Sequence, residues 1–199
     1  MWQAQVFTLY PDVFPGPLSK GLYGKAMSKN IWNLKVVNIR DAAEDKHKTV
    51  DDTPYGGGSG MLMKPDVLAK SLDQNKNEGE KILYLSPRGK KFDQNYAKEL
   101  SKEKSISIIC GHFEGVDERV LSTRNIEEVS IGDFVLSGGE SAAFVIIDSI
   151  VRLLPGVIGN SYSLSEESFE VQRFLVNSET LFSQYGFHFR IKFRLLLVP

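Results

Sequence analysis

Hydrophobic and polar positions alternate along this chain in blocks whose lengths fit strands and helices in turn. Short apolar runs bounded by turn residues predict strands at residues 5–9, 34–38, 81–85, 105–110 and 128–136. Apolar residues at helical spacing predict helices at residues 18–28, 65–72, 93–102, 117–122 and 140–154. This alternation predicts an α/β fold with a mainly parallel sheet flanked by helices.

The predicted helix at residues 140–154 stands out because apolar residues nearly encircle it, so we expect it to be buried. Pro155 and Gly156 end it. The glycine-rich run at residues 55–60 cannot form a regular element. From residue 178 to the end, no helical or strand period persists, and the pattern determines no structure there.

Composition narrows the class of protein. A chain of 199 residues suits one domain, or a domain with an appendage. No apolar run approaches the length of about 18 residues that spans a membrane, and the first residues lack a secretory pattern. The net charge of −1 provides no global attraction to nucleic acid, and the single cysteine cannot form an internal disulfide. We therefore expect a soluble cytoplasmic protein.

Three predicted strands end in small residues. The run Ser130-Ile-Gly-Asp-Phe-Val-Leu-Ser-Gly-Gly-Glu breaks at glycines directly before the apolar helix. Similar breaks occur at Tyr84-Leu-Ser-Pro-Arg-Gly and Cys110-Gly-His-Phe-Glu-Gly. Glycine lets backbone amides approach a ligand, and pockets in α/β sheets form at the carboxyl ends of strands. The three breaks therefore predict one shared pocket.

Other candidate residues have simpler explanations. The loop at residues 55–60 lacks the ending of a phosphate loop, so it fits a lid, a backbone surface against a planar base, or a plain linker. The three histidines have no zinc-site spacing. Cys110 ends an apolar strand and is expected to be a buried thiol. Asp117 is expected to favour the start of a helix. Arg152 either reaches water at a helix end or stabilises charge on a carbonyl oxygen.

Six segments together resemble one family, the bacterial tRNA (guanine-N1)-methyltransferases (TrmD) of the SPOUT class. The three glycine breaks belong to this pattern, as do Leu154-Pro-Gly-Val-Ile-Gly, Thr49-Val-Asp-Asp-Thr-Pro-Tyr-Gly-Gly-Gly-Ser-Gly-Met and the opening Phe7-Thr-Leu-Tyr-Pro-Asp-Val-Phe. The segments occur in order and at family spacing over residues 1 to about 170. The resemblance implies a knotted methyltransferase domain at residues 1–160, with a deep C-terminal trefoil knot in the sheet, and a linker and atypical tail at residues 161–199. Such knots are rare exceptions to ordinary topology.

In the family, the knot's loops hold S-adenosylmethionine, and the resemblance carries these contacts to residues of the three glycine breaks. The implied cofactor-binding residues are Tyr84, Leu85, Ser86, Pro87, Gly89, Gly111, Glu114, Ile131, Gly132, Asp133, Phe134, Val135, Leu136, Gly138 and Gly139. The residues agree with this role, since backbone groups can read the adenine edge, Ile131 and Leu136 can cover its faces, and Glu114 can balance a cationic group.

The implied reaction transfers a methyl group to N1 of the guanosine that follows a tRNA anticodon (position 37). Guanine N1 carries a proton, so a base must remove it while another group stabilises charge on O6. The family's base is an aspartate whose place is taken here by Glu167, and its O6-stabilising arginine corresponds to Arg152. The resemblance also implies a homodimer with shared active sites and a magnesium ion held with the substrate, since no dedicated metal ligands are visible.

The chain departs from the family pattern in two places. His112 and Phe113 stand where the family has arginine and tyrosine. After Phe169, the motifs that lead to the family's tRNA-binding C-terminal domain cannot be found. A knotted cofactor-binding or RNA-binding dimer with impaired catalysis is therefore the alternative. A dinucleotide-dependent oxidoreductase is excluded, because no Gly-x-Gly-x-x-Gly follows the first strand.

Overall fold

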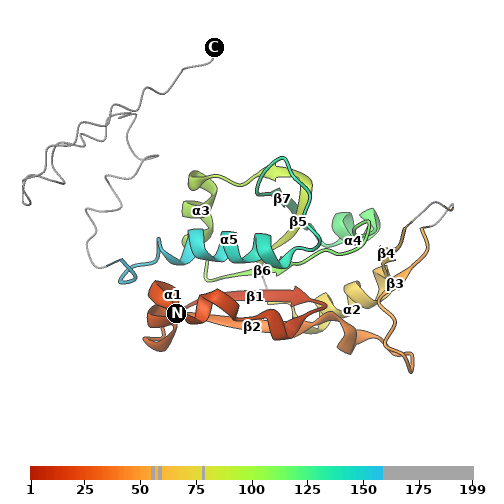
Figure 1. Ribbon diagram of the computed structural model, residues 1–199, viewed down its shortest axis with the longest axis horizontal. Coiled ribbons are helices and arrows are strands. Elements are labelled where there is room, and N and C mark those ends of the chain that lie inside the picture. Colours follow the sequence, from red (N-terminus) through yellow and green to blue (C-terminus); the bar gives the residue numbers. More distant parts are fainter. Residues whose placement is uncertain (55–56, 58–59, 78, 159–199) are drawn as a thin grey trace, which may run out of the picture. The chain divides into compact units, whose positions relative to one another are not determined.

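A computed structural model describes residues 1–54, 57, 60–77 and 79–158 (Figure 1). The predicted tail at residues 161–199, with Glu167, lies outside this part. The main strands are β1 (Trp2–Thr8), β2 (Trp32–Asn38), β5 (Lys81–Lys91), β6 (Ser105–Ile109) and β7 (Glu127–Ser130). The helices are α1 (Gly21–Ser28), α2 (Pro65–Asn75), α3 (Gln94–Ser101), α4 (Glu118–Thr123) and α5 (Glu140–Val151). Short 3₁₀ turns η1 (Pro11–Val13), η2 (Gly16–Ser19) and η3 (Ile39–Ala42), and the hairpin strands β3 (Asp51–Asp52) and β4 (Leu62–Met63), complete the elements.

The five main strands form one sheet in the order β2-β1-β6-β5-β7, and every neighbouring pair is parallel. The predicted α/β class with a mainly parallel sheet is thus confirmed. Because all strands run the same way, their carboxyl ends lie along one edge of the sheet, where the segments that follow β5, β6 and β7 can meet. The trefoil knot stays a prediction.

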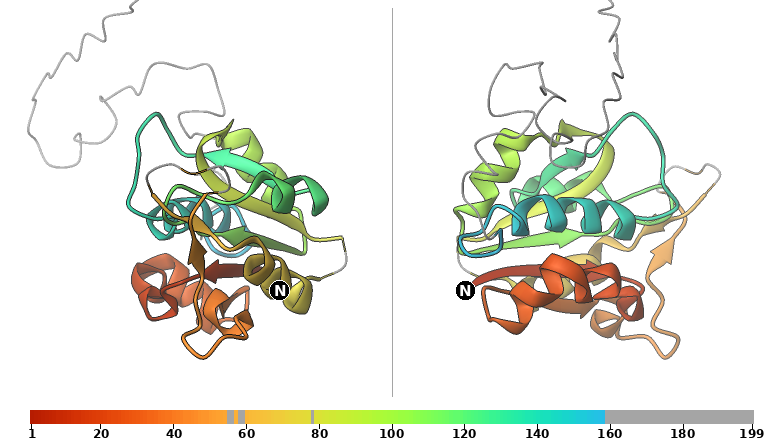
Figure 2. Two further views of the ribbon diagram at one scale, coloured as in Figure 1. Left: turned by 90° about the vertical axis from the view of Figure 1, so that its right-hand side faces the viewer. Right: turned by 60° about the vertical axis from the view of Figure 1, so that its left-hand side comes forward.

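Helices cover both faces of the sheet, and the alternation of side chains explains which face each covers (Figures 1 and 2). Ala4 and Val6 of β1 point to a core shared with α1, α3 and α5, whereas Phe7 points to a second core with η3, α2 and α4. The apolar helix predicted at residues 140–154 is largely buried against the first core, although its Val145 is 48% exposed. None of the helices in the described ranges is long and apolar enough to cross a membrane.

Several predicted boundaries were wrong, each for a local reason. The helix predicted at residues 18–28 is split into η2 and α1, because Lys20 is extended and Gly21 has a φ of +59°. Helix α2 continues to Asn75, three residues past its predicted end at residue 72. Strand β5 runs through the first glycine break to Lys91, and β7 ends at Ser130, six residues before the predicted end.

Candidate functional site

A cavity of about 420 Å³ lies where β5, β6 and β7 end and α5 begins. Its walls come from residues 84–88, 111–115, 129–132 and 134–139, together with Ala142. The structure therefore brings the three glycine breaks into one pocket, as their positions after parallel strands had suggested. The pocket is lined by all of the predicted cofactor-binding residues except Gly89 and Asp133.

Gly89 lies outside the lining but shapes the first wall. A Cβ atom at this position would lie 2.3 Å from the Val129 backbone nitrogen, so only glycine lets β5 approach β7 this closely. The ladder between these strands shifts here, since Leu85 and Lys90 both face Val129. The residues between them therefore bulge out of the ladder, and the side chain of Ser86 accepts a hydrogen bond from the Arg88 N–H at 3.2 Å.

Tyr84 forms the inner wall between the first two segments. Its side chain is buried, and burial, followed by the charge of Glu128, raises the pKa of its hydroxyl. A Cβ atom on Gly111 would lie 2.6 Å from the Tyr84 ring, and one on Gly115 would lie 3.0 Å from its hydroxyl oxygen. The two glycines therefore make room for a tyrosine that remains an uncharged hydrogen-bonding group at neutral pH.

Glu114 is held by the segment that follows the glycine-rich loop. Its N–H donates to the Met61 carbonyl at 2.9 Å, and the Met63 N–H donates to the Gly115 carbonyl at 3.0 Å. A Cβ atom on Gly60 would lie 2.5 Å from Glu114 Cγ, so the end of the loop packs on this carboxylate side chain. Residues 55, 56, 58 and 59 lie outside the described part, and the choice between lid, base platform and linker stays open.

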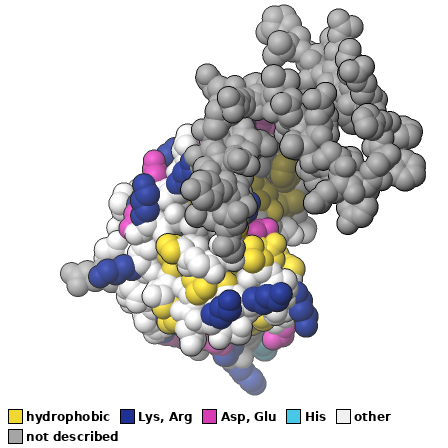
Figure 3. Space-filling view, turned by 90° about the vertical axis from the view of Figure 1, so that its left-hand side faces the viewer, with side chains coloured by type: hydrophobic (Ala, Val, Ile, Leu, Met, Phe, Trp, Pro, Cys, Tyr) yellow, Lys and Arg dark blue, Asp and Glu magenta, His cyan; other side chains and the backbone are white. Residues whose placement is uncertain are grey.

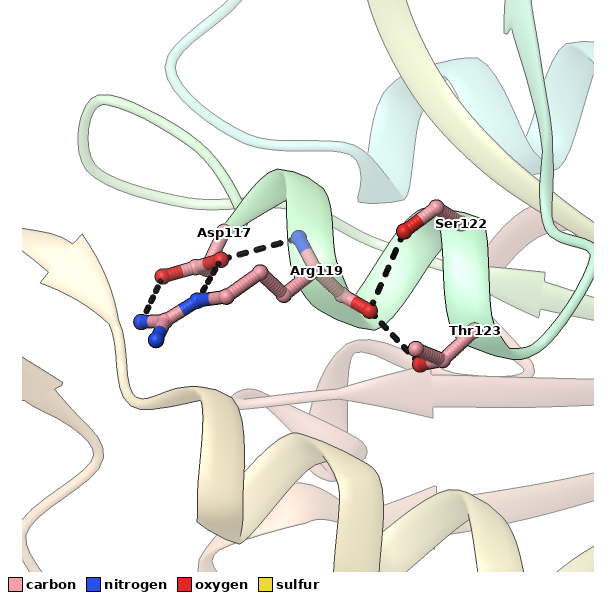
Figure 4. A network of polar contacts seen from close by, with 4 residues as sticks. All are labelled: Asp117, Arg119, Ser122 and Thr123. Atoms are coloured by element: carbon pink, nitrogen blue, oxygen red, sulfur yellow. Dashed lines mark hydrogen bonds and ion pairs between the residues drawn. The ribbon is translucent and has the colours of Figure 1, made fainter.

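Helix α4 follows the second wall of the pocket in the chain, and Figure 4 shows the polar contacts at its start. Asp117 caps the helix, because its carboxylate accepts from the Arg119 backbone N–H at 2.9 Å and from the Arg119 guanidinium at 2.9 and 2.7 Å. These hydrogen bonds lower the pKa of Asp117 to about 2. Thr123 donates to the Arg119 carbonyl within the same helix. The predicted role of Asp117 at the start of a helix is confirmed.

The third wall is a loop, not the strand that its apolar residues had suggested. After β7, Gly132 adopts a φ of +155° and Ser130 Oγ bonds both the N–H and the carbonyl of Gly132, which turns the chain away from the sheet. Phe134, Val135 and Leu136 are then 52%, 85% and 40% exposed. These three hydrophobic side chains therefore line the pocket instead of filling a core.

The start of α5 closes the pocket. Gly139 donates its N–H to the Gly111 carbonyl at 3.0 Å, and a Cβ atom on Gly139 would lie 2.6 Å from Cys110 Cα. Cys110 is fully buried, as predicted, and burial followed by the charge of Glu140 raises its pKa well above the ordinary thiol value.

Glu140, the first residue of α5, is buried and pairs with His112. Its two carboxylate oxygens each lie 2.9 Å from His112 Nε2, and Thr8 donates to the carboxylate at 2.6 Å. Sequence reasoning missed this pairing and the lining residues Arg88, Phe113, Gly115, Val129, Ser130, Ser137 and Ala142. For all of these except Val129 and Ala142, a position within the glycine breaks was the available signal.

Arg152 lies at the other end of α5, where it is the C-cap residue. Asp148, one turn earlier, accepts a hydrogen bond from the Tyr23 hydroxyl at 3.1 Å, and its charge raises the pKa of Tyr23. Arg152 is close enough to lower that pKa slightly. Since α5 rises about 1.5 Å per residue, Arg152 lies roughly 20 Å from Gly139 and outside the pocket of its own chain.

The described residues contain no group of three or more His, Cys, Asp or Glu side chains that could hold a metal ion. Charge on the visible surface is mixed. On the side that carries α1 in Figure 1, Lys or Arg side chains stand beside hydrophobic ones, with acidic side chains among them (Figure 3). The described part of this face therefore shows no continuous basic patch (Figure 3).

Comparisons with known proteins agree with one another. The family model described as tRNA (guanine-1)-methyltransferase TrmD matches residues 2–181. A protein of Pelagibacter ubique (strain HTCC1062) named tRNA (guanine-N(1)-)-methyltransferase is 78% identical over 170 residues, which cover 85% of this chain and 75% of the relative. Proteins with the same name from Bartonella tribocorum and Ehrlichia canis are 57% and 47% identical, covering 85% and 90% of this chain and 72% and 75% of theirs.

Proposed function

This chain belongs to the tRNA (guanine-1)-methyltransferase family TrmD, and we propose that it transfers a methyl group to N1 of a guanine in tRNA. The single observation that carries the proposal is the joining of the family's three glycine breaks into one cavity at the carboxyl edge of the sheet. The high identity to proteins named for this reaction favours the enzyme over a cofactor-binding scaffold without catalysis.

The methyl donor that fits this pocket is S-adenosylmethionine, whose sulfonium supplies an electrophilic methyl group when bound. The volume of about 420 Å³ lies within the range of about 300–1,000 Å³ that small-molecule sites occupy. Gly111 and Gly138 bring backbone to the lining of the pocket, Ile131 and Leu136 offer apolar surfaces for a base, and Glu114 offers a carboxylate for a cationic group. These residues suit a planar base and a positively charged amino acid portion, both of which S-adenosylmethionine contains.

The chain's own residues then have to remove a proton and stabilise an oxygen. We assign Glu167 as the base that takes the N1 proton and Arg152 as the group that stabilises charge on O6, following the family pattern. N1 forms its bond to the methyl carbon as the methyl–sulfur bond breaks, and the electron pair of that bond stays on sulfur. A positioned base and a guanidinium aimed at developing charge are the two groups this reaction requires.

The position of Arg152 supports a homodimer with shared active sites. Arg152 lies roughly 15 Å along α5 from Ala142, the last residue of this helix that lines the pocket, and is not itself part of the lining in its own chain. We infer that a second copy, related by a two-fold axis, supplies the end of its α5 to this pocket. Val145, which is 48% exposed in the middle of α5, offers part of the surface for such a contact.

The test is transfer of labelled methyl from S-adenosylmethionine to tRNA that carries guanosine directly after the anticodon. The matched substrate carries 1-methylguanosine there, which has no N1 proton to lose. We expect label on the first tRNA and none on the second, and Glu167→Gln should abolish transfer while donor binding by calorimetry persists. Binding of the donor without transfer to any tRNA would instead support the scaffold.

A further inference from the structure

We propose that His112 is a positioning residue that ties two loops of the cofactor pocket together through Glu140. The proposal rests on the function proposed above, since it assigns the pocket to S-adenosylmethionine. His112 belongs to the loop after β6, and Glu140 follows the loop after β7 at the first position of α5. The two side chains, each 11% exposed, meet at 2.9 Å between Nε2 and either carboxylate oxygen.

The direction of each hydrogen bond follows from the donors available. The Tyr10 N–H donates to Thr8 Oγ1 at 2.9 Å, and Thr8 in turn donates its hydroxyl proton to Glu140 at 2.6 Å. An ionised carboxylate can only accept, so Nε2 of His112 must carry a proton to complete the contact. The Tyr10 ring stands edge-on to the imidazole at 5.0 Å between centroids and limits its rotation. His112 is thus fixed from two sides.

This pairing acts on the pocket because of where the imidazole lies. A Cβ atom on Gly138 would lie 2.2 Å from His112 Cε1 and 2.7 Å from a Glu140 carboxylate oxygen, so the glycine turn rests directly on the pair. The backbone bond from Gly139 to Gly111 is the second link between the same loops. Gly111, Glu114, Gly138 and Gly139 all line the pocket. Loss of the pair would therefore let the two cofactor walls move apart.

The test compares His112→Leu with His112→Gln, whose amide can donate from about the position of Nε2. Leucine should raise the Kd for S-adenosylhomocysteine and the KM for S-adenosylmethionine about tenfold or more, because a hydrogen bond to a charged group is lost. The kcat at saturating donor should stay within about twofold, whereas glutamine should restore donor affinity to within about threefold. Ser107→Ala is the matched control, because it removes a partly buried 2.9 Å hydrogen bond to a carboxylate, that of Glu80, away from the pocket lining.

Amide hydrogen exchange without any donor separates this proposal from the proposed function. His112→Leu should accelerate exchange at residues 111–115 and 131–139, and His112→Gln should not. If the parent chain binds no donor but this exchange pattern is seen, the proposed function fails and the positioning role stands. Unchanged exchange in His112→Leu would overturn the positioning role. So would equal weakening of donor binding by the leucine, glutamine and Ser107→Ala variants, because only general destabilisation would then be at work.

Discussion

The two ends of α5 differ in what they touch and in what they can do. At the first turn, Glu140 is buried in a network with Thr8 and His112 that faces the cavity. At the last turn, Arg152 lies with Asp148 and Tyr23, away from the cavity. One rigid helix thus separates the groups assigned to donor binding from a group assigned to catalysis. We therefore expect that mutations can remove donor binding without methyl transfer chemistry being altered at Arg152, and can remove methyl transfer without weakening donor binding.

The largest effect on methyl transfer is expected from substituting Arg152. Arg152→Ala should lower kcat for methyl transfer about 100- to 1,000-fold, because a donor aimed at the developing charge on O6 is lost. The Kd for S-adenosylhomocysteine, measured by calorimetry, should stay within about twofold, since Arg152 is assigned to guanine O6 and not to the donor. Arg124→Ala, which breaks a surface pair with Asp73, is the control and should leave kcat near the parent value. Parent-like transfer in Arg152→Ala would remove this residue from the mechanism.

Mixing two inactive variants tests whether the ends belong to different copies. Gly139→Ala should abolish donor binding, because its new Cβ would lie 2.6 Å from Cys110 Cα. Each heterodimer with Arg152→Ala would then contain one site with an intact pocket and an intact arginine. Random mixing of equal amounts should restore about a quarter of the parent activity. Folding of Gly139→Ala is checked by circular dichroism, and a mixture no more active than its parts would mean that the sites are not shared.

A smaller effect is expected from the neighbour of the arginine. Tyr23→Phe removes the hydroxyl that donates to Asp148 at 3.1 Å, so the Asp148 carboxylate, one turn before Arg152, loses a hydrogen bond that fixes its orientation. We expect kcat to fall about threefold, with an unchanged KM for the donor. Because the charge of Asp148 raises the pKa of Tyr23, the parent hydroxyl keeps its proton through neutral pH. The ratio of variant to parent kcat should therefore be constant from pH 6 to about 9, and a ratio that changes across this range would contradict the assignment.

The smallest effect concerns helix α4. Asp117→Ala should lower the free energy of unfolding by about 1 kcal/mol through loss of the α4 cap. The bonds to Arg119 lower the folded-state pKa of Asp117 to about 2, so its stabilisation is present above the ordinary value near 4 and lost as the pH falls towards 2. Denaturant unfolding at pH 7 and pH 2.5 measures this. An equal difference between parent and variant at both pH values would rule out the cap as the cause.

Sequence patterns predicted the parallel α/β class and the meeting of three glycine breaks because both follow from chain order. They failed where an apolar run could form either a buried strand or a loop that lines a cavity. The residues Ile131 to Leu136 look like a buried strand but lie over a ligand cavity, and nothing in their hydrophobicity distinguishes these environments. The pairing of His112 with Glu140 joins positions 28 residues apart and depends on loop geometry. The distance of Arg152 from the pocket, in contrast, could have been counted from the helix length.

The buried sulfur of Cys110 gives this molecule a built-in reporter. It is the chain's one cysteine, it lies beneath Gly139, and burial raises the pKa that controls its reactivity. A disulfide reagent would meet no reactive thiolate until the packing of Gly139 on Cys110 opens. The rate of labelling of the parent protein, followed as one mass adduct per molecule, would therefore report how often this packing opens. A bound donor should lower that rate.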